Sequence, residues 1–457
     1  MIAPGRGTWL ACAAVLACTL QAEAGPRVVL LDIDGVRRDT LETAYRSGKM
    51  PNLERLFGRN LESAMWFDNA TAAFPAITMA GQASLFTGVS PARHGIPGNQ
   101  WFDRRTGRVI NYFSSAAMPC VYGVAAFSMA ECGAGLANSH LQSRTIYEAA
   151  TAAGKTSTVV FSQYWKGATH VVLPSINEAA ALIRGTAIDY QRFDELMVAG
   201  AVKSLRRDGI PDLLTLYFTG ADGIGHKSGT RGQAEYLKQR WDKLLETILD
   251  EFDKLDPTWR THTQFILTSD HGRTDTKANA ADISLEAAIE VALQGSAYVI
   301  VENGGVVHLY LRSKQPGAGW TAQPSPTEVE AAAKALSTSP SLKPLLETIA
   351  ARSNGPGTGY RLIDTDPKEA SRITAMVGSI DSARSGDILL LLKAGRYMGN
   401  QETTGAQHGS IFQKDLAIPL VIAQGGAAAG HSPVALTTTD IARIIATYLG
   451  FTLLPNP

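Results

Sequence analysis

Short, nearly uninterrupted apolar runs recur along the chain and predict strands that are buried on both faces. The runs lie at 27–32, 156–161, 213–218, 264–268, 387–392 and 418–422. Helical patterns stand between several of them, at 53–56, 146–153 and 233–255. Strands that alternate with helices predict an α/β fold, with a mostly parallel central sheet covered by helices on both faces. In such sheets, ligands bind beyond the carboxyl ends of the strands.

Side chains that can bind metal ions follow or close these apolar runs. They are Asp34, Thr78, Asp222, His226, Asp270, His271 and His408. The acids and histidines are ligand types for divalent metals, and Thr78 is a hydroxyl that such metals could convert into a nucleophile. Mixed Asp and His ligation favours Zn²⁺ or a similar ion over Ca²⁺ and Mg²⁺, which prefer oxygen. The pattern predicts a two-metal hydrolase.

Each of these residues also has an ordinary structural interpretation. Asp34 precedes a glycine and could be a turn residue, and Asp32 competes with it as a ligand. Thr78 begins a helical pattern, so it could be an N-cap. If it is the nucleophile instead, the free N–H groups of the same helix start favour an incoming phosphate. His408 alone is consistent with a loop histidine. The combination of residues, rather than any single one, favours a catalytic site.

Two stretches depart from the alternation of strands and helices. Residues from about 98 to 137 are rich in aromatic residues and glycine, and they predict a surface insertion near the site. Residues from about 274 to 386 contain helical patterns at 285–293 and 327–336 and a hairpin pattern at 298–311 that turns at Asn303-Gly304-Gly305. Because the second stretch separates two ligand-bearing segments, we expect it to form a subdomain inserted between core strands.

The composition narrows the possible functions. The 457 residues include 42 basic and 42 acidic side chains, so the formal net charge is zero. Without an excess of Lys and Arg, we expect neither binding to a nucleic-acid polymer nor a polybasic membrane patch. Apolar residues make up 45% and charged residues 18%, which is typical of a globular protein with a large core.

The first residues resemble a secretory leader. Arg6 precedes an apolar stretch at 9–20, and Ala22-Glu23-Ala24 matches a small-x-small cleavage site. We therefore expect a signal peptide at 1–24 and a hydrolase domain at 25–457, exported to the periplasm or secreted. The apolar stretch is shorter than the roughly 20 residues that span a bilayer, so we expect no transmembrane anchor. Lipoprotein processing at Cys18 is an alternative.

Removal of the leader leaves two of the four cysteines, Cys120 and Cys132. In an exported protein, such a pair predicts a local disulfide, and two buried free thiols are the alternative. A zinc site at these cysteines is not indicated, because no histidine or second cysteine pair lies nearby at ligand spacing.

The ordered set of motifs resembles the alkaline phosphatase superfamily, and in particular its type I phosphodiesterase/nucleotide pyrophosphatase branch. The matching motifs are Asp34-Gly35-Val36-Arg37, Pro51-Asn52-Leu53, Phe74-Pro75-Ala76-Ile77-Thr78, Thr87-Gly88, His94-Gly95-Ile96, Asp222 with His226, Ser269-Asp270-His271-Gly272 and His408-Gly409. The resemblance runs from about residue 27 to 450 and implies an alkaline-phosphatase-like fold.

The resemblance also implies roles for individual residues. Asp34, Thr78, Asp270 and His271 would surround one zinc ion, and Asp222, His226 and His408 would hold a second. Thr78 would be the nucleophile and would form a phospho-threonine intermediate with a small phosphoester substrate. Asn99 and the backbone N–H of Met79 would donate hydrogen bonds to the oxygens on which charge builds.

The sequence departs from this branch at positions that bear on the substrate. Close members often have Phe-Pro-Asn-His where this chain has Met79-Ala80-Gly81-Gln82, and Phe-Trp-Pro-Gly where it has Tyr164-Trp165-Lys166-Gly167. Monoesterase relatives use Lys or Arg to bind a dianionic phosphate, so Lys166 is a candidate substrate-binding residue. Alternatively, it is a solvated charge.

The resulting expectation is a phosphodiesterase or nucleotide pyrophosphatase, with an alkaline phosphomonoesterase that uses threonine as the alternative. A sulfatase would require a Cys or Ser precursor, which Thr78 does not supply. A non-catalytic binding protein on the same fold would be expected to lack a ligand or the nucleophile, and this sequence retains both. The leaving group and the oligomeric state stay open.

Overall fold

The computed structural model describes residues 25–114, 135–175, 177–178, 183–184, 187–276, 285–398 and 405–453. The expected signal peptide and the predicted pair Cys120 and Cys132 lie outside these residues. Within them, no helix is both long and apolar enough to cross a membrane.

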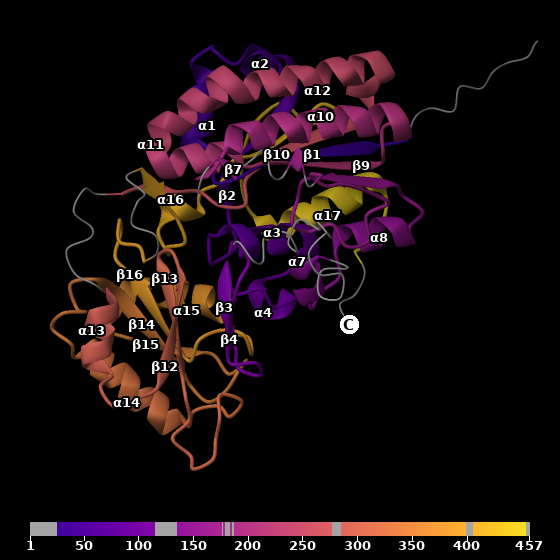
Figure 1. Ribbon diagram of the computed structural model, residues 1–457. Coiled ribbons are helices and arrows are strands. Elements are labelled where there is room, and N and C mark those ends of the chain that lie inside the picture. Colours follow the sequence, from indigo (N-terminus) through magenta and orange to yellow (C-terminus); the bar gives the residue numbers. More distant parts are fainter. Residues whose placement is uncertain are drawn as a thin grey trace, which may run out of the picture.

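The central sheet has eight strands in the order β19-β2-β18-β10-β1-β9-β5-β6 (Figure 1). Their bounds are β1 Arg27–Ile33, β2 Ala64–Thr71, β5 Ser157–Val160, β6 His170–Val172, β9 Leu213–Phe218, β10 Thr263–Thr268, β18 Leu420–Ala423 and β19 Gly430–Thr437. β1 pairs in parallel with β10 and β9, and the parallel ladder continues through β5 to β6. β18 runs antiparallel to both of its neighbours, and β19 lies parallel to β2. The predicted α/β fold with a mostly parallel sheet is confirmed.

Helices cover both faces of this sheet (Figure 1). One layer contains α1 Arg38–Arg46, α2 Pro51–Phe57, α10 Tyr190–Asp208, α11 Gly220–Tyr236 and α12 Asp242–Leu255. The other contains α3 Thr78–Thr87, α7 Leu136–His140, α8 Ile146–Ala152 and α17 Thr438–Leu449. In α12, the buried residues Leu245, Ile248, Leu249 and Phe252 repeat at helical spacing and form its core-facing stripe. The pattern at 233–255 therefore predicted α12 correctly, although the end of α11 and a π-turn at Leu237–Trp241 make up its first part.

A second sheet of five antiparallel strands has the order β12-β13-β16-β14-β15. Its strands are β12 Tyr298–Asn303, β13 Val306–Leu311, β14 Leu346–Arg352, β15 Tyr360–Ile363 and β16 Ile388–Leu392. The same part of the chain contains the helices α13 Leu285–Ala292, α14 Pro326–Ser337 and α15 Pro367–Gly378. The predicted hairpin at 298–311 is confirmed as β12 and β13. The expectation that the run 387–392 is a strand of the core is wrong, because β16 lies in the middle of this second sheet. A strand buried on both faces gives the same apolar run in either sheet.

The remaining described elements are short. They are η1 Arg59–Leu61, α4 Pro91–His94, β3 Gln100–Asp103, β4 Arg108–Asn111, β7 Ile183–Arg184, β8 Ala187–Ile188, η3 Trp259–Thr261, β11 Thr274–Asp275, β17 Ala406–Gln407 and α16 Gln413–Leu416. β3 pairs with β4, and β11 pairs with β17, which brings the segment after β10 next to the segment before His408.

The turn between β12 and β13 connects the second sheet to the ends of two other segments. Asn303 is buried, and its side chain accepts a hydrogen bond from the Gln100 N–H (3.1 Å) and donates one to the Gln100 carbonyl (3.0 Å). The Gly305 N–H donates to the His408 carbonyl (3.2 Å). Gly304 has φ +65°, and a Cβ at this residue would lie 2.2 Å from the His408 carbonyl oxygen, so only glycine fits. The turn thus fixes the chain on either side of the candidate site.

Candidate active site

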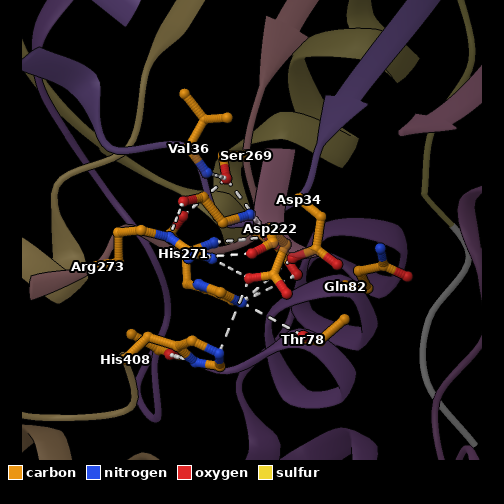
Figure 2. A network of polar contacts seen from close by, with 12 residues as sticks. Asp34, Val36, Thr78, Gln82, Asp222, Ser269, His271, Arg273 and His408 are labelled. Atoms are coloured by element: carbon orange, nitrogen blue, oxygen red, sulfur yellow. Dashed lines mark hydrogen bonds and ion pairs between the residues drawn. The ribbon is translucent and has the colours of Figure 1, made fainter. Parts of the chain in front are cut away.

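The seven predicted ligands lie together beyond the carboxyl ends of β1, β9 and β10 (Figure 2 labels Asp34, Thr78, Asp222, His271 and His408). Because these three strands are adjacent and parallel, the residues that follow them meet at one edge of the sheet. α3 and the segment after β17 supply the remaining members, Thr78 and His408.

His271 is at the centre of the contacts. Its Nε2 lies 3.3 Å from Thr78 Oγ1, 3.3 Å from Asp34 Oδ1 and 3.7 Å from Asp270 Oδ2. Its Nδ1 lies 2.9 Å from the Gly272 carbonyl oxygen, which can only accept a hydrogen bond. A proton on Nδ1 leaves the Nε2 lone pair facing the carboxylates, which is the tautomer that a metal ligand needs.

Two groups of residues could each hold a metal ion. Each group has three residues with one donor atom apiece, and the three atoms lie within 4.8 Å of one another. The first group consists of Asp34, Asp270 and His271, and the second of Asp222, His271 and His408. The rings of His271 and His408 stack with their centroids 3.8 Å apart. His226, which the family resemblance assigns to the second ion, lies beside this group, because its Nε2 is 3.2 Å from Asp222 Oδ2.

The first group suits a divalent cation. Asp34 Oδ1 and Asp270 Oδ2 are buried and have no hydrogen-bond partner among the described residues. The other oxygen of Asp270, Oδ1, accepts hydrogen bonds from the N–H groups of Gly35 (3.1 Å) and His271 (3.0 Å). Buried carboxylate oxygens without partners are costly unless a cation binds them.

The pKa values follow from this crowding of acids. Burial, followed by the charges of Asp270 and Asp222, raises the pKa of Asp34 well above its usual value. Burial also raises the pKa of Asp270 to about 7. The pKa of His408 is well below its usual value because of burial and the neighbouring His271. Burial therefore favours the neutral form of His408, and the crowded acids resist full ionisation unless a cation such as a metal ion offsets their charge.

Thr78 is the first residue of α3, but it is not the N-cap. Ile77 occupies that position, and no side chain caps the helix. The ordinary interpretation of Thr78 as an N-cap is therefore wrong. Its hydroxyl is buried and points to His271 instead. Asp32, the competitor of Asp34, accepts a hydrogen bond from Gln82 (3.0 Å) and belongs to neither metal group in the described part of the chain.

The two expected hydrogen-bond donors contact each other. The Met79 N–H donates to Asn99 Oδ1 at 2.9 Å. This bond orients the Asn99 side chain, so the amide nitrogen of Asn99 is the group left to donate to a substrate.

A family model for type I phosphodiesterase / nucleotide pyrophosphatase matches residues 28–411. The chain belongs to this family. The resemblance drawn from the motifs is thereby confirmed. Membership in this family of metal-dependent phosphoesterases implies divalent metal ions, and the Asp and His groups are candidates to bind them.

A curated alkaline phosphatase is also similar to this chain. The chain is 27% identical to alkaline phosphatase PhoK of Sphingomonas over 267 residues, which cover 53% of this chain and 45% of that protein. The match thus spans about half the length of the curated relative.

Solved structures show the same fold. An inactive variant of murine ectonucleotide pyrophosphatase / phosphodiesterase 5, in complex with AMP, matches with a TM-score of 0.64 and 17% identity over 94% of this chain and 97% of that one. Phosphonoacetate hydrolase of Sinorhizobium meliloti 1021, in complex with phosphonoformate, matches with a TM-score of 0.60 and 19% identity over 93% and 96%.

In this phosphodiesterase family member, three residues to which the sequence assigned no role support the ligands. Tyr217 of β9 donates a hydrogen bond to Asp34 Oδ2. Ser269 accepts from the Val36 N–H (3.0 Å) and donates to the His271 carbonyl (2.7 Å). Arg273 is fully buried and contacts Asp222. The only signal in the sequence was position, since each residue stands within three residues of a ligand or of a strand end.

Lys166 lies apart from these contacts. Its ammonium is 3.7 Å from Glu148 of α8, and its side chain is 44% exposed. Tyr164, two residues earlier, is buried, and its hydroxyl donates a hydrogen bond to the Met79 carbonyl (3.0 Å). The segment that carries Lys166 therefore contacts the first turn of α3. A role for Lys166 in substrate binding stays a prediction.

Proposed function

We propose that the protein is an exported phosphoester hydrolase that transfers a phosphoryl group to Thr78 with the help of two divalent metal ions, most simply Zn²⁺. The observation that carries this proposal is the position of the Thr78 hydroxyl, 3.3 Å from His271 Nε2 and so beside the first group of ligands. Family membership supports phosphoester hydrolysis as the reaction class.

Asp34, Thr78, Asp270 and His271 would hold one ion, and Asp222, His226 and His408 the other. The unpartnered oxygens of Asp34 and Asp270 fit such a role. When bound, the ions would lower the pKa of the Thr78 hydroxyl and of a water molecule, and they would neutralise charge on the phosphoryl group.

The residues of the chain then divide the reaction between them. Thr78 Oγ1 gives its proton to solvent and forms a bond to phosphorus, while the bond from phosphorus to the leaving-group oxygen breaks and that oxygen keeps the electron pair and takes up a proton from solvent. A water oxygen then bonds to phosphorus, the bond from phosphorus to Thr78 Oγ1 breaks, and a proton from the water restores the hydroxyl. The Asn99 amide donates to a phosphoryl oxygen, and the positive end of the α3 dipole faces the same charge.

We infer that the preferred substrate is a small phosphodiester or nucleotide pyrophosphate. The family supports this choice, as does the structural similarity to a nucleotide pyrophosphatase that binds AMP. The second candidate is a phosphomonoesterase, which Lys166 and the similarity to alkaline phosphatase PhoK favour. Export rests on the leader at 1–24, and a mature N-terminus at Gly25 in the exported protein would support it.

A paired assay tests the proposal. Purified, zinc-loaded protein is compared on bis-p-nitrophenyl phosphate and p-nitrophenyl phosphate, with Thr78→Ala as the control. A larger kcat/KM for the diester, lost in the variant, supports the phosphodiesterase. A larger value for the monoester selects the phosphatase. Absence of turnover on either substrate, with both metal ions bound, would favour a binding protein on the same fold.

Lys166→Ala is expected to lower kcat/KM for a monoester by about tenfold and that for a diester by less than about twofold. The reason is that a monoester carries a second negative charge at neutral pH, which the ammonium would contact. Glu148→Gln is a matched control, because glutamine keeps the capping box of α8 but removes the ion pair with Lys166. Equal losses on both substrates in Lys166→Ala would assign the residue to packing.

A further inference from the structure

Arg273 is a cation built into the ligand cluster. Its side chain is fully buried. Its Nη2 forms an ion pair with Asp222 Oδ1, its Nη1 donates to the Asp222 carbonyl (3.1 Å) and its Nε donates to the Gly35 carbonyl (2.8 Å). Figure 2 shows its side chain reaching toward Asp222 beside His271. One guanidinium thereby joins the end of β1, the first turn of α11 and the segment after β10.

Two glycines make room for this side chain. A Cβ at Gly35 would lie 2.3 Å from Arg273 Nη2, and a Cβ at Gly225 would lie 1.8 Å from Arg273 Nη1. Both distances are far shorter than a non-bonded contact allows, so any other residue at either position would displace the guanidinium. The backbone on both sides of the site is therefore shaped around an arginine.

The ion pair divides the Asp222 carboxylate into two sides. Oδ1 faces Arg273 and lies 4.0 Å from His408 Nε2, and Oδ2 lies 3.2 Å from His226 Nε2. An arginine stays protonated at any pH at which the protein is folded. Asp222 therefore has a fixed cationic partner that does not depend on a metal ion.

The first group has no such partner. Asp34 Oδ1 and Asp270 Oδ2 lack hydrogen-bond partners in the described part of the chain, and among the same residues these two acids form ion pairs with His271 only. Their charge would be offset mainly by a metal ion, whereas part of the charge of Asp222 is already offset. A cation gains more from a carboxylate whose charge is not shared.

We propose that Arg273 is a positioning residue that serves as a permanent counter-charge for Asp222 and thereby makes the metal ion held by Asp222, His226 and His408 the weaker bound and more exchangeable of the two. The guanidinium contacts Asp222 at Oδ1 and at the backbone carbonyl, which leaves Oδ2 toward His226. This inference rests on the two-metal assignment of the proposed function.

Zinc titration of chelator-treated protein tests the inference without any substrate. The wild type is expected to show two dissociation constants, and Asp222→Asn should remove the weaker one. In Arg273→Met, the weaker site should bind about tenfold more tightly, because Asp222 then has only the metal ion as a cationic partner besides histidine. Arg273→Lys keeps the charge and should stay closer to the wild type.

Thermal stability provides a second readout. Arg273→Met should lower the Tm of the chelated protein by about 5 °C more than that of the zinc-loaded protein, since only the chelated form leaves Asp222 with neither an arginine nor a metal ion as partner. If Arg273→Met does not fold without zinc, the double variant Asp222→Asn/Arg273→Met removes both charges. It should then match Asp222→Asn in the difference between loaded and chelated Tm.

The outcomes separate the inference from the proposed function. Equal Tm losses in both forms, with both dissociation constants unchanged, would overturn the role of Arg273 and leave the two-metal assignment in place. Loss of the tighter site in Asp222→Asn would overturn it as well. A wild-type protein that binds no zinc or other divalent ion at all would overturn both the inference and the metal assignment on which the proposed function relies.

Discussion

Thr78→Ala is expected to lower kcat on a phosphodiester by about 10⁴-fold or more while the protein stays folded. The expected loss is large because, among the described residues, Thr78 supplies the one hydroxyl in contact with His271 Nε2. Without it, water would have to replace the nucleophile. The expected effect on stability is small. Thr78 caps no helix, and its hydroxyl has one long contact, to His271.

Two companion variants make this result specific. Thr78→Ser keeps a hydroxyl at the same place and should retain measurable turnover. Thr87→Ala, at the other end of α3, removes a buried threonine whose hydroxyl donates to the Ala83 carbonyl (2.6 Å), and it should leave kcat nearly unchanged. A Thr78→Ala enzyme with kcat within about tenfold of the wild type would remove Thr78 from the mechanism.

The sequence predicted the position of the site because a simple rule governs it. Asp34, Asp222 and Asp270 each follow an apolar run, and the three runs became the adjacent parallel strands β1, β9 and β10. Their carboxyl ends then had to lie at one edge of the sheet. Thr78 and His408 do not directly follow strands of the central sheet, so their place in the site was predicted from the order of the motifs instead.

The pairing of more distant strands could not be predicted in the same way. β18 was predicted as a strand, yet nothing in its apolar run showed that it lies antiparallel to β10 and β2. β16 has an equally apolar run and belongs to the second sheet. Burial on both faces determines composition, whereas partner and direction depend on contacts between residues far apart in the chain.

The contacts between individual side chains also could not be predicted from the sequence. A pattern of ligands does not indicate that Arg273 would reach Asp222, because this contact depends on glycines in two other segments, Gly35 and Gly225. Likewise, the Met79 N–H and Asn99 were both expected to face the substrate, and their mutual hydrogen bond appears only in three dimensions.

Asp270→Asn is expected to have opposite effects on activity and on the stability of the metal-free protein. In the folded protein the pKa of Asp270 is about 7, against about 3.9 for an unperturbed aspartate. Between these values the folded state binds more protons than the unfolded state, so the free energy of unfolding falls as the pH rises through this window. Above about pH 7 the whole cost is present, on the order of 4 kcal/mol. Asparagine carries no charge, so the variant does not have this cost.

The substitution preserves the local geometry, because the Asn oxygen can still accept from the N–H groups of Gly35 and His271. Chelated Asp270→Asn should therefore unfold at a higher urea concentration than the chelated wild type at about pH 8, and the difference should shrink toward about pH 5. Activity should nevertheless fall by about 10³-fold, because a neutral amide is a poor metal ligand.

Asp194→Asn is the matched control for the pH dependence. Burial raises the pKa of Asp194 to about 7 as well, but its carboxylate accepts hydrogen bonds from Tyr236 (2.6 Å) and the Thr219 N–H (2.8 Å), not from the ligand cluster. It should alter stability in the same pH window while zinc affinity stays near the wild-type value. If chelated Asp270→Asn is no more stable than the chelated wild type at about pH 8, the crowding of carboxylates does not oppose folding, and the metal ions are not needed to relieve it.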